Sequence, residues 1–297
     1  MTTTFILVFI GLAGAFIAFL HIPTPVAAVC RRELYTLVNG PVGLVSLTAF
    51  LLISQIMFAV AIFKYGEASM RPFFEQIPLA FSLVAPLVAM RMWAEERRVG
   101  TLEILLTLPA KSYATVSGKF LAGLAFLALC MLGTISTPLI LEYSLTESSE
   151  EIKRQEFRSQ AHDSDSKKTS DDEETRISGL GPDWGIIWGG YSGSLLLAAF
   201  TLAIGSFASS LTRDQIVAAI LGLTICLIFW AFGYHLVENT LNGIYKGMGT
   251  FIAEFSHQRR FMNLAKGLWD WTDVLFFCSG AFVFLWLTKT VIDKQRV

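Results

Sequence analysis

One serine stands in a pattern that could carry nucleophilic chemistry. Ser192 lies in the run GYSG at 190–193, and two histidines, His235 and His257, follow it in the chain. A serine hydroxyl becomes a nucleophile when a histidine within hydrogen-bond reach takes its proton. Such a pair would cleave an acyl bond, provided that the fold brings one histidine to Ser192. The glycines of the run are also typical of helices that pack closely in lipid.

Other patterns for catalysis, cofactors or metals are missing from the sequence. It contains no GxxxxGK[ST] run, so we expect no nucleotide-binding P-loop in this chain. It contains no HExxH, and its four histidines share no metal-ligand spacing. Its four cysteines form no CxxC pair, and three of them lie in apolar runs, so we expect reduced, buried thiols. These observations predict a chain that binds no cofactor or metal of its own.

A second candidate site is a cluster of four charges, Glu95, Glu96, Arg97 and Arg98, here called the elbow charges. Gly100 and Thr101 follow them. The next piece, 102–108, carries leucines at helical spacing on one face and Glu103 on the other. This pattern predicts a compact polar element against a membrane surface, with the elbow charges facing water or a partner protein. An ordinary solvated loop is the alternative.

The composition around these candidates is that of a membrane protein. The chain has 297 residues, of which 54% are hydrophobic and 16% charged, whereas soluble domains have about 25% charged residues. A net charge of −1 excludes a general basic surface for nucleic acid. Long uncharged runs predict an all-α polytopic membrane protein with six main transmembrane helices, at 42–63, 77–90, 117–141, 184–211, 216–236 and 274–288.

The segments outside these runs predict further elements. Residues 1–26 form an extra N-terminal segment, whose apolar part is either an additional span or a hairpin in the interface. Residues 27–38 predict an interfacial helix, the alternative being a plain linker. Its charged residues lie off the apolar face: Arg31, Arg32 and Glu33. The polar run 146–177 predicts a disordered, non-cytoplasmic insert. A stripe of glycines predicts close helix packing in the fourth span: Gly185, Gly189 and Gly193.

Four stretches carry a resemblance to a known family. They are WAEERRVGTLEILLTLP at 93–109, here called the elbow, RRELYTLVNGPVG at 31–43, the run 189–222 and a final span ending in Lys and Arg. Together they resemble membrane subunits of bacterial ABC exporters of the ABC-type-2 permease family. The nearest branch is the one found with gliding-motility and nitrous-oxide-reductase maturation operons. The resemblance covers 27–297 apart from the polar insert, and it implies that these residues form an exporter permease domain with cytoplasmic interfacial and coupling helices.

The resemblance implies a mechanism and partners. A separate ATPase subunit would hold ATP and Mg, dock on the elbow and drive alternating access across the bacterial inner membrane. A second copy or a sister permease would complete a dimer surrounded by membrane lipid. The residues implied in coupling to the ATPase are Glu95, Glu96, Arg97, Arg98, Gly100, Thr101, Glu103 and Arg213.

A second resemblance points to a different function. The GYSG run matches the GxSG of rhomboid-type intramembrane serine proteases, so a protease using Ser192 is the alternative function.

The paired arginines at 31–32 and 97–98 lie close to predicted spans. Since short positive segments stay inside the cell, they predict that their side, and with it the C-terminus, is cytoplasmic.

Overall fold

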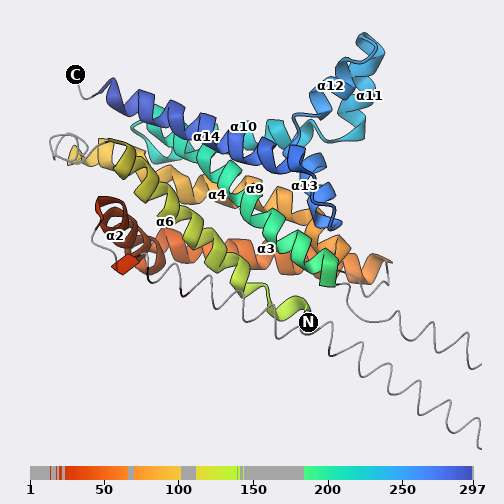
Figure 1. The fold of residues 1–297 in the computed structure, drawn as a ribbon, viewed down its shortest axis with the longest axis horizontal. Helices are drawn as coiled ribbons and strands as arrows, with labels where there is room; N and C mark the ends of the chain where they lie inside the picture. Colours follow the sequence, from red (N-terminus) through yellow and green to blue (C-terminus); the bar gives the residue numbers. More distant parts are fainter. Residues whose placement is uncertain are drawn as a thin grey trace, which may run out of the picture.

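A computed structural model describes residues 24–65, 70–101, 112–138 and 184–295, with a few isolated positions besides. Within these ranges every regular element is a helix (Figure 1), which confirms the predicted all-α class. The predicted N-terminal segment, the amphipathic piece 102–108 and the polar insert lie outside the described residues. The helices are α2 (Pro25–Asn39), α3 (Pro41–Tyr65), α4 (Arg71–Val99), α6 (Ser112–Gly133), α9 (Trp184–Leu211), α10 (Gln215–Ala231), α11 (His235–Ile244), α12 (Met248–Ala253), α13 (His257–Ala265) and α14 (Trp271–Asp293).

Five helices of the described chain are long and apolar enough to cross a membrane: Pro41–Val60, Arg71–Val99, Ser112–Pro138, Gly185–Leu211 and Trp271–Asp293. A sixth span exists if α10 and α11, which meet at 73°, are taken together. The predicted fifth span at 216–236 is therefore wrong at its C-terminal end, because α10 stops at Ala231 and the chain bends before α11. The break lies at Gly233, where an added Cβ would collide with the Ser256 hydroxyl that caps α13.

α4 is longer than its predicted span of 77–90. Its 29 residues reach about 43 Å, more than the roughly 30 Å of a hydrocarbon core. The helix carries the elbow charges on its last turns and ends at Gly100, whose φ of 78° stops helical hydrogen bonding. The elbow charges are thus presented by a rigid helix, whereas the sequence pattern placed them beyond the span.

α4 and α9 form the centre of the bundle because small residues let them approach closely. Gly205 of α9 lies against Ala89 and the backbone of Pro86 in α4. The Ser209 hydroxyl accepts hydrogen bonds of 3.1 Å from the backbone amides of both Trp93 and Ala94. These contacts join the ends of α4 and α9 into one unit.

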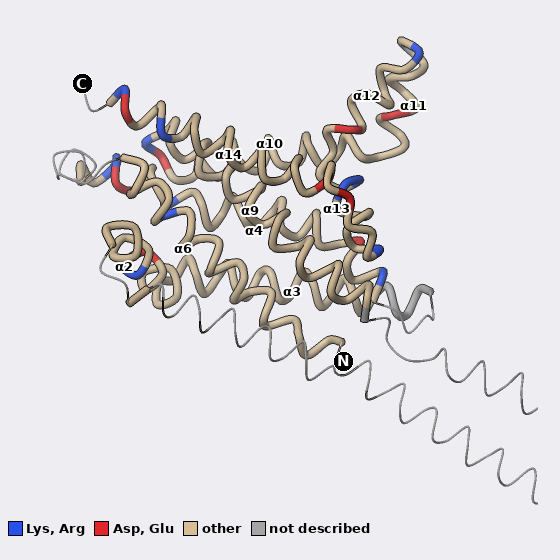
Figure 2. The backbone as a smooth tube through the Cα atoms, viewed as in Figure 1, with Lys and Arg blue, Asp and Glu red and all other residues tan. Residues whose placement is uncertain are grey.

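The bundle has two polar ends. The α2 end, defined by α2, the last turns of α4, the start of α6 and the C-terminal end of α14, lies at the left of Figure 1. The α13 end lies opposite, and α11 and α12 project beyond it. Charged residues gather at these two ends and leave the middle of the bundle uncharged (Figure 2).

Candidate functional site

A buried lysine joins three helices at the α2 end. Lys119 lies in the first turns of α6 and is only 2% exposed. Its Nζ is 3.0 Å from the Glu33 carboxylate of α2 and 2.9 Å from the Glu96 carboxylate of α4. α2 can lie this close to α6 because Gly118 faces the Val26 carbonyl and the Val29 side chain, with no room for a Cβ.

Arg32 completes what we call the Lys119 cluster: Arg32, Glu33, Glu96 and Lys119. Its guanidinium is 2.7 Å from Glu33 and 3.2 Å from Glu96. Two acids thus face two bases. Burial by itself would raise the pKa of Glu33, but the charge of Lys119 and the hydrogen bonds from Arg32 and Lys119 outweigh it and lower that pKa. Glu33 is therefore ionised at neutral pH.

The Trp93 ring packs against the Lys119 ammonium of the cluster. The Lys119 ammonium lies 5.3 Å from the centre of the Trp93 indole, a distance at which cation and ring attract. The indole nitrogen donates to the Ser206 hydroxyl of α9 at 3.1 Å. The Lys119 cluster is therefore coupled to α9 through one rigid side chain.

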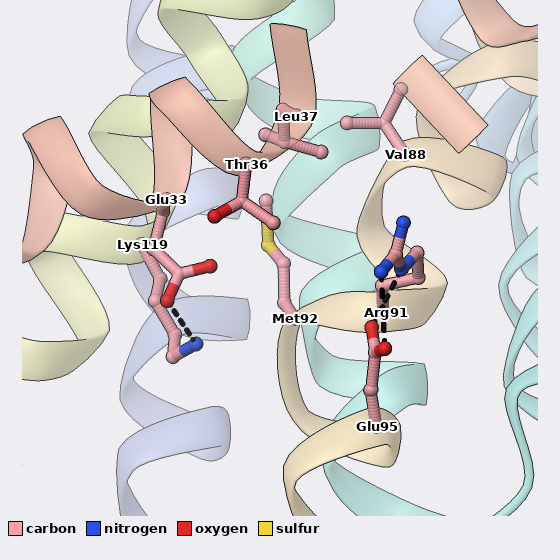
Figure 3. A pocket seen from close by; sticks show the side chains of 8 residues that line it. All are labelled: Glu33, Thr36, Leu37, Val88, Arg91, Met92, Glu95 and Lys119. Atoms are coloured by element: carbon pink, nitrogen blue, oxygen red, sulfur yellow. Dashed lines mark hydrogen bonds and ion pairs between the residues drawn. The ribbon is translucent and has the colours of Figure 1, made fainter. Parts of the chain in front are cut away.

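A second ion pair borders the cluster. Arg91 and Glu95, one helical turn apart on α4, make two hydrogen bonds of 2.6 and 3.0 Å. A small pocket lies between this pair and the Glu33–Lys119 pair (Figure 3), and Thr36, Leu37, Val88 and Met92 complete its lining. Its volume of about 30 Å³ holds one or two water molecules. The pocket is thus too small for a transported molecule.

Comparison of the chain with models of protein families identifies the family to which it belongs. The model of the ABC-2 family transporter protein matches residues 73–288, from the start of α4 to the last turns of α14. The chain belongs to the ABC-2 transporter family. A comparison with curated proteins found no match. As an ABC-2 family member with several apolar helices, it is a multi-pass membrane subunit of an ABC transporter.

The elbow charges of this ABC-2 subunit differ in their surroundings. Glu95 and Glu96 find partners within the chain, whereas the sequence pattern predicted water or a partner protein. Arg98 is exposed, and Arg97 is partly buried beside Arg213. The difference arises because the partners of Glu96 come from α2 and α6, far away in the sequence.

The remaining predicted residues lie either beside the cluster or, for the glycine stripe, at the α13 end. Arg31 is exposed on α2, next to Arg32. Gly100 ends α4, and the Thr101 hydroxyl donates to the Glu96 carbonyl at 3.4 Å. Glu103 lies outside the described residues. Gly189 and Gly193 pack against α13 near Leu264, rather than against another spanning helix, and the carbonyl of Gly185 faces Gly267.

Lys119 is the residue that the sequence analysis missed as part of a site. Its signal was present: it is a single lysine inside an apolar run, and an ionisable residue within a membrane span marks a functional site by default. The partners of Lys119 could not be named from that signal, since Glu33 lies on a separate interfacial helix.

The geometry does not support the protease interpretation. Ser192 donates its hydroxyl to the helix carbonyls of Trp188 and Gly189. His257 faces another serine, with its Nε2 3.0 Å from the Ser82 hydroxyl. His235 is an exposed side chain 3.8 Å from Glu238. Each histidine thus lies beside a residue other than Ser192, and the GYSG glycines serve helix packing.

Proposed function

We propose that this ABC-2 subunit is the permease of an exporter that moves its substrate across the bacterial inner membrane by alternating access. A separate ATPase subunit, which holds ATP and Mg, supplies the work, and a second copy or a sister permease completes the dimer. The family match over 73–288 carries the proposal. The likeness of the elbow favours the gliding-motility and nitrous-oxide-reductase maturation branch.

In this proposal the α2 end faces the cytoplasm. Paired arginines lie there at 31–32 on α2 and at 97–98 on α4, and Arg213 lies in the turn between α9 and α10. Positive charge close to spans is retained on the cytoplasmic side. The C-terminal end of α14 is at the same end, so the C-terminus is cytoplasmic as well (Figure 1).

The contacts at the α2 end provide a route for force. The elbow begins on the last turns of α4, with the elbow charges, and continues past Gly100, where α4 ends. A push on the elbow moves the end of α4, and the Lys119 cluster passes that movement to α2 and α6 through ion pairs of 2.9 to 3.2 Å. Ser206 and Ser209 pass it to α9. Four helices then tilt together, as alternating access requires.

The spans suggest the class of substrate. Of the six predicted spans, only 117–141, with Lys119, and 216–236, with His235, contain an Asp, Glu, Lys, Arg or His. Pathways for small ions are normally marked by ionisable residues within the membrane. An amphipathic substrate, such as a lipid or an apolar peptide, suits these surfaces better than a small ion.

Co-purification of the ATPase tests the proposal. Arg98→Glu reverses an exposed charge at the end of α4, and Gly100→Pro cannot adopt the φ of 78° from which the elbow departs. Both variants should insert normally yet retain less of the co-expressed ATPase in mild detergent and stimulate its turnover less. Lys294→Glu, an exposed charge reversal at the same end, is the control. Normal retention and turnover in both elbow variants would show that the elbow is not the coupling site.

A further inference from the structure

Arg97 is a charged side chain that lacks hydrogen-bond acceptors for part of its guanidinium group among the described residues. Two of its guanidinium nitrogens, Nε and one terminal nitrogen, are buried and have no hydrogen-bond partner among the described residues. The positive charge of Arg213 repels it. By contrast, Arg32, Arg91 and Lys119 at the same end each have a carboxylate partner.

This arrangement raises the free energy of the folded chain when nothing is bound to it. A buried donor without an acceptor destabilises the fold, and a charged donor does so more strongly. A second positive charge nearby adds repulsion. The acid next to Arg213 does not help, because the Asp214 carboxylate accepts the Ile216 amide at 3.0 Å and caps α10. The Ser209 hydroxyl binds the backbone amides of Trp93 and Ala94, about one turn before Arg213 and Arg97, so the two arginines lie at the same junction. Their like charges therefore indicate an anion that comes from outside the chain.

The surroundings of Arg213 indicate where that anion comes from. Only three residues, 212–214, separate α9 from α10. The apolar side chains on both flanks are exposed: Leu211 by 46%, Ile216 by 69% and Val217 by 46%. Since such side chains on spanning helices contact acyl chains, a turn this short holds Arg213 at the level of the lipid headgroups. A lipid phosphate reaches this level more readily than a side chain of a soluble protein.

We propose that Arg97 and Arg213 together bind the phosphate of an anionic phospholipid at the α2 end of the bundle. Guanidinium groups bind phosphate through two parallel hydrogen bonds, and basic pockets between membrane helices hold anionic headgroups. The bound phosphate supplies acceptors to the buried nitrogens of Arg97 and cancels its repulsion with Arg213. The site would secure the turn after α9 to the end of α4, and it does not depend on the proposed ATPase contact.

Lipid binding to the purified full-length chain tests the site. The chain is delipidated in mild detergent and titrated separately with phosphatidylglycerol, phosphatidylcholine and inorganic phosphate, and bound ligand is counted by native mass spectrometry. We expect tight binding of phosphatidylglycerol only. Arg97→Gln combined with Arg213→Gln should weaken that binding roughly ten- to thirty-fold, since each basic side chain contributes about 1 kcal/mol at a membrane surface.

A matched control removes the same number of charges from the same end. Lys289→Gln combined with Lys294→Gln should leave the affinity for phosphatidylglycerol within about two-fold of the wild type, because Lys289 is already paired with Asp293 and Lys294 is an exposed side chain. If the double arginine variant expresses poorly, each single variant should still show a partial loss.

Several results would overturn the proposal. Equal losses in the arginine and lysine variants would show a general charge effect rather than a site. Equal binding of inorganic phosphate and phosphatidylglycerol would assign the arginines to a free anion. Unchanged lipid affinity of the arginine variant, together with loss of a co-expressed ATPase, would assign them to the ATPase. The last result would leave the proposed transport function standing, so the two proposals fail separately.

Discussion

Lys119 is buried because several neighbouring groups share its charge. Two carboxylates within 3.0 Å neutralise it, the Trp93 ring faces it, and Arg32 balances the excess acid. Such a cluster does not stabilise a fold simply by existing, since taking charges out of water costs nearly as much as their attraction returns. Its value here is positional, because it fixes α2, α4 and α6 at one point.

Removing Lys119 alone should therefore destabilise the folded chain. Lys119→Met leaves two carboxylates in a buried site with only Arg32, so we expect the free energy of unfolding to fall by roughly 3 kcal/mol. Thermal unfolding in detergent measures the loss. Lys289→Met, which breaks an exposed pair with Asp293 at 3.7 Å, should cost less than about 1 kcal/mol. Adding Glu33→Gln and Glu96→Gln to Lys119→Met should restore most of the loss. An unchanged melting temperature in the single variant would contradict a charge-neutralising role.

His257 at the α13 end predicts a dependence of stability on pH. Burial lowers the pKa of His257 to about 4, against about 6.5 in an unfolded chain. Between these values the unfolded state binds more protons, so stability falls as the pH drops from 6.5 towards 4. The loss should reach about 3 kcal/mol at most.

Melting temperatures across that range provide the measurement. His257→Gln keeps a polar group for Ser82 without a titrating ring, so it should flatten the dependence. His235→Gln, at a side chain that is 96% exposed, should leave it as in the wild type. If His257→Gln melts with the same pH dependence as the wild type, another group is responsible.

At the scale of elements, α9 owes its central place to small residues. Gly190 faces the ring of Phe74 on α4, and Ser194 and Ser209 turn their hydroxyls to backbone carbonyls. In a membrane, where lipid is as apolar as leucine, such close packing is what holds helices together. The serines of α9 thus combine close approach with satisfied hydrogen bonds.

Gly190→Ala should consequently weaken the α4–α9 contact. The new Cβ would collide with three atoms of the Phe74 ring, which is itself 1% exposed and cannot move freely. We expect a loss of about 1–3 kcal/mol from overpacking, measured as a lower melting temperature. Gly243→Ala on α11, where nothing lies within 4 Å, should be neutral or slightly stabilising, since alanine favours helix. Equal behaviour of the two variants would mean that Phe74 adapts without cost.

At the scale of the whole molecule, the proposed orientation places the α2 end in the cytoplasm and the α13 end on the other side of the membrane. The α2 end carries the arginine pairs at 31–32 and 97–98 and the C-terminal end of α14, and the α13 end carries α11 and α12 (Figure 2). The proposed orientation therefore predicts that the α13 end is accessible from outside the cell and that the α2 end is not.

Cysteine labelling in intact cells checks this orientation. A cysteine-free background needs four replacements, of which only Cys278 is exposed. In that background Lys246→Cys, between α11 and α12, should react with an impermeant thiol reagent, and Lys294→Cys at the end of α14 should react only after lysis. Both lysines are exposed, so burial does not confuse the comparison. The opposite labelling would invert the orientation, and labelling of both would break the topology between them.

The sequence by itself determined the class and most of the spans. A hydrocarbon layer requires roughly 20 apolar residues in succession, a condition that each segment meets or fails alone. α3, α9 and α14 could therefore be predicted from uncharged runs, and the elbow could be recognised from its own letters. The glycine stripe of α9 was also visible, although not which helix it would face.

Only the tertiary structure decided how distant residues pair. Glu96 and Lys119 meet at 2.9 Å across two helices, and no local pattern shows that a charge at the end of one helix will find its partner on another. The break after Ala231 follows from the approach of α13 to Gly233. Spans are set by a local property of the chain, whereas ion pairs, breaks and the unpaired Arg97 depend on how helices far apart in the sequence pack.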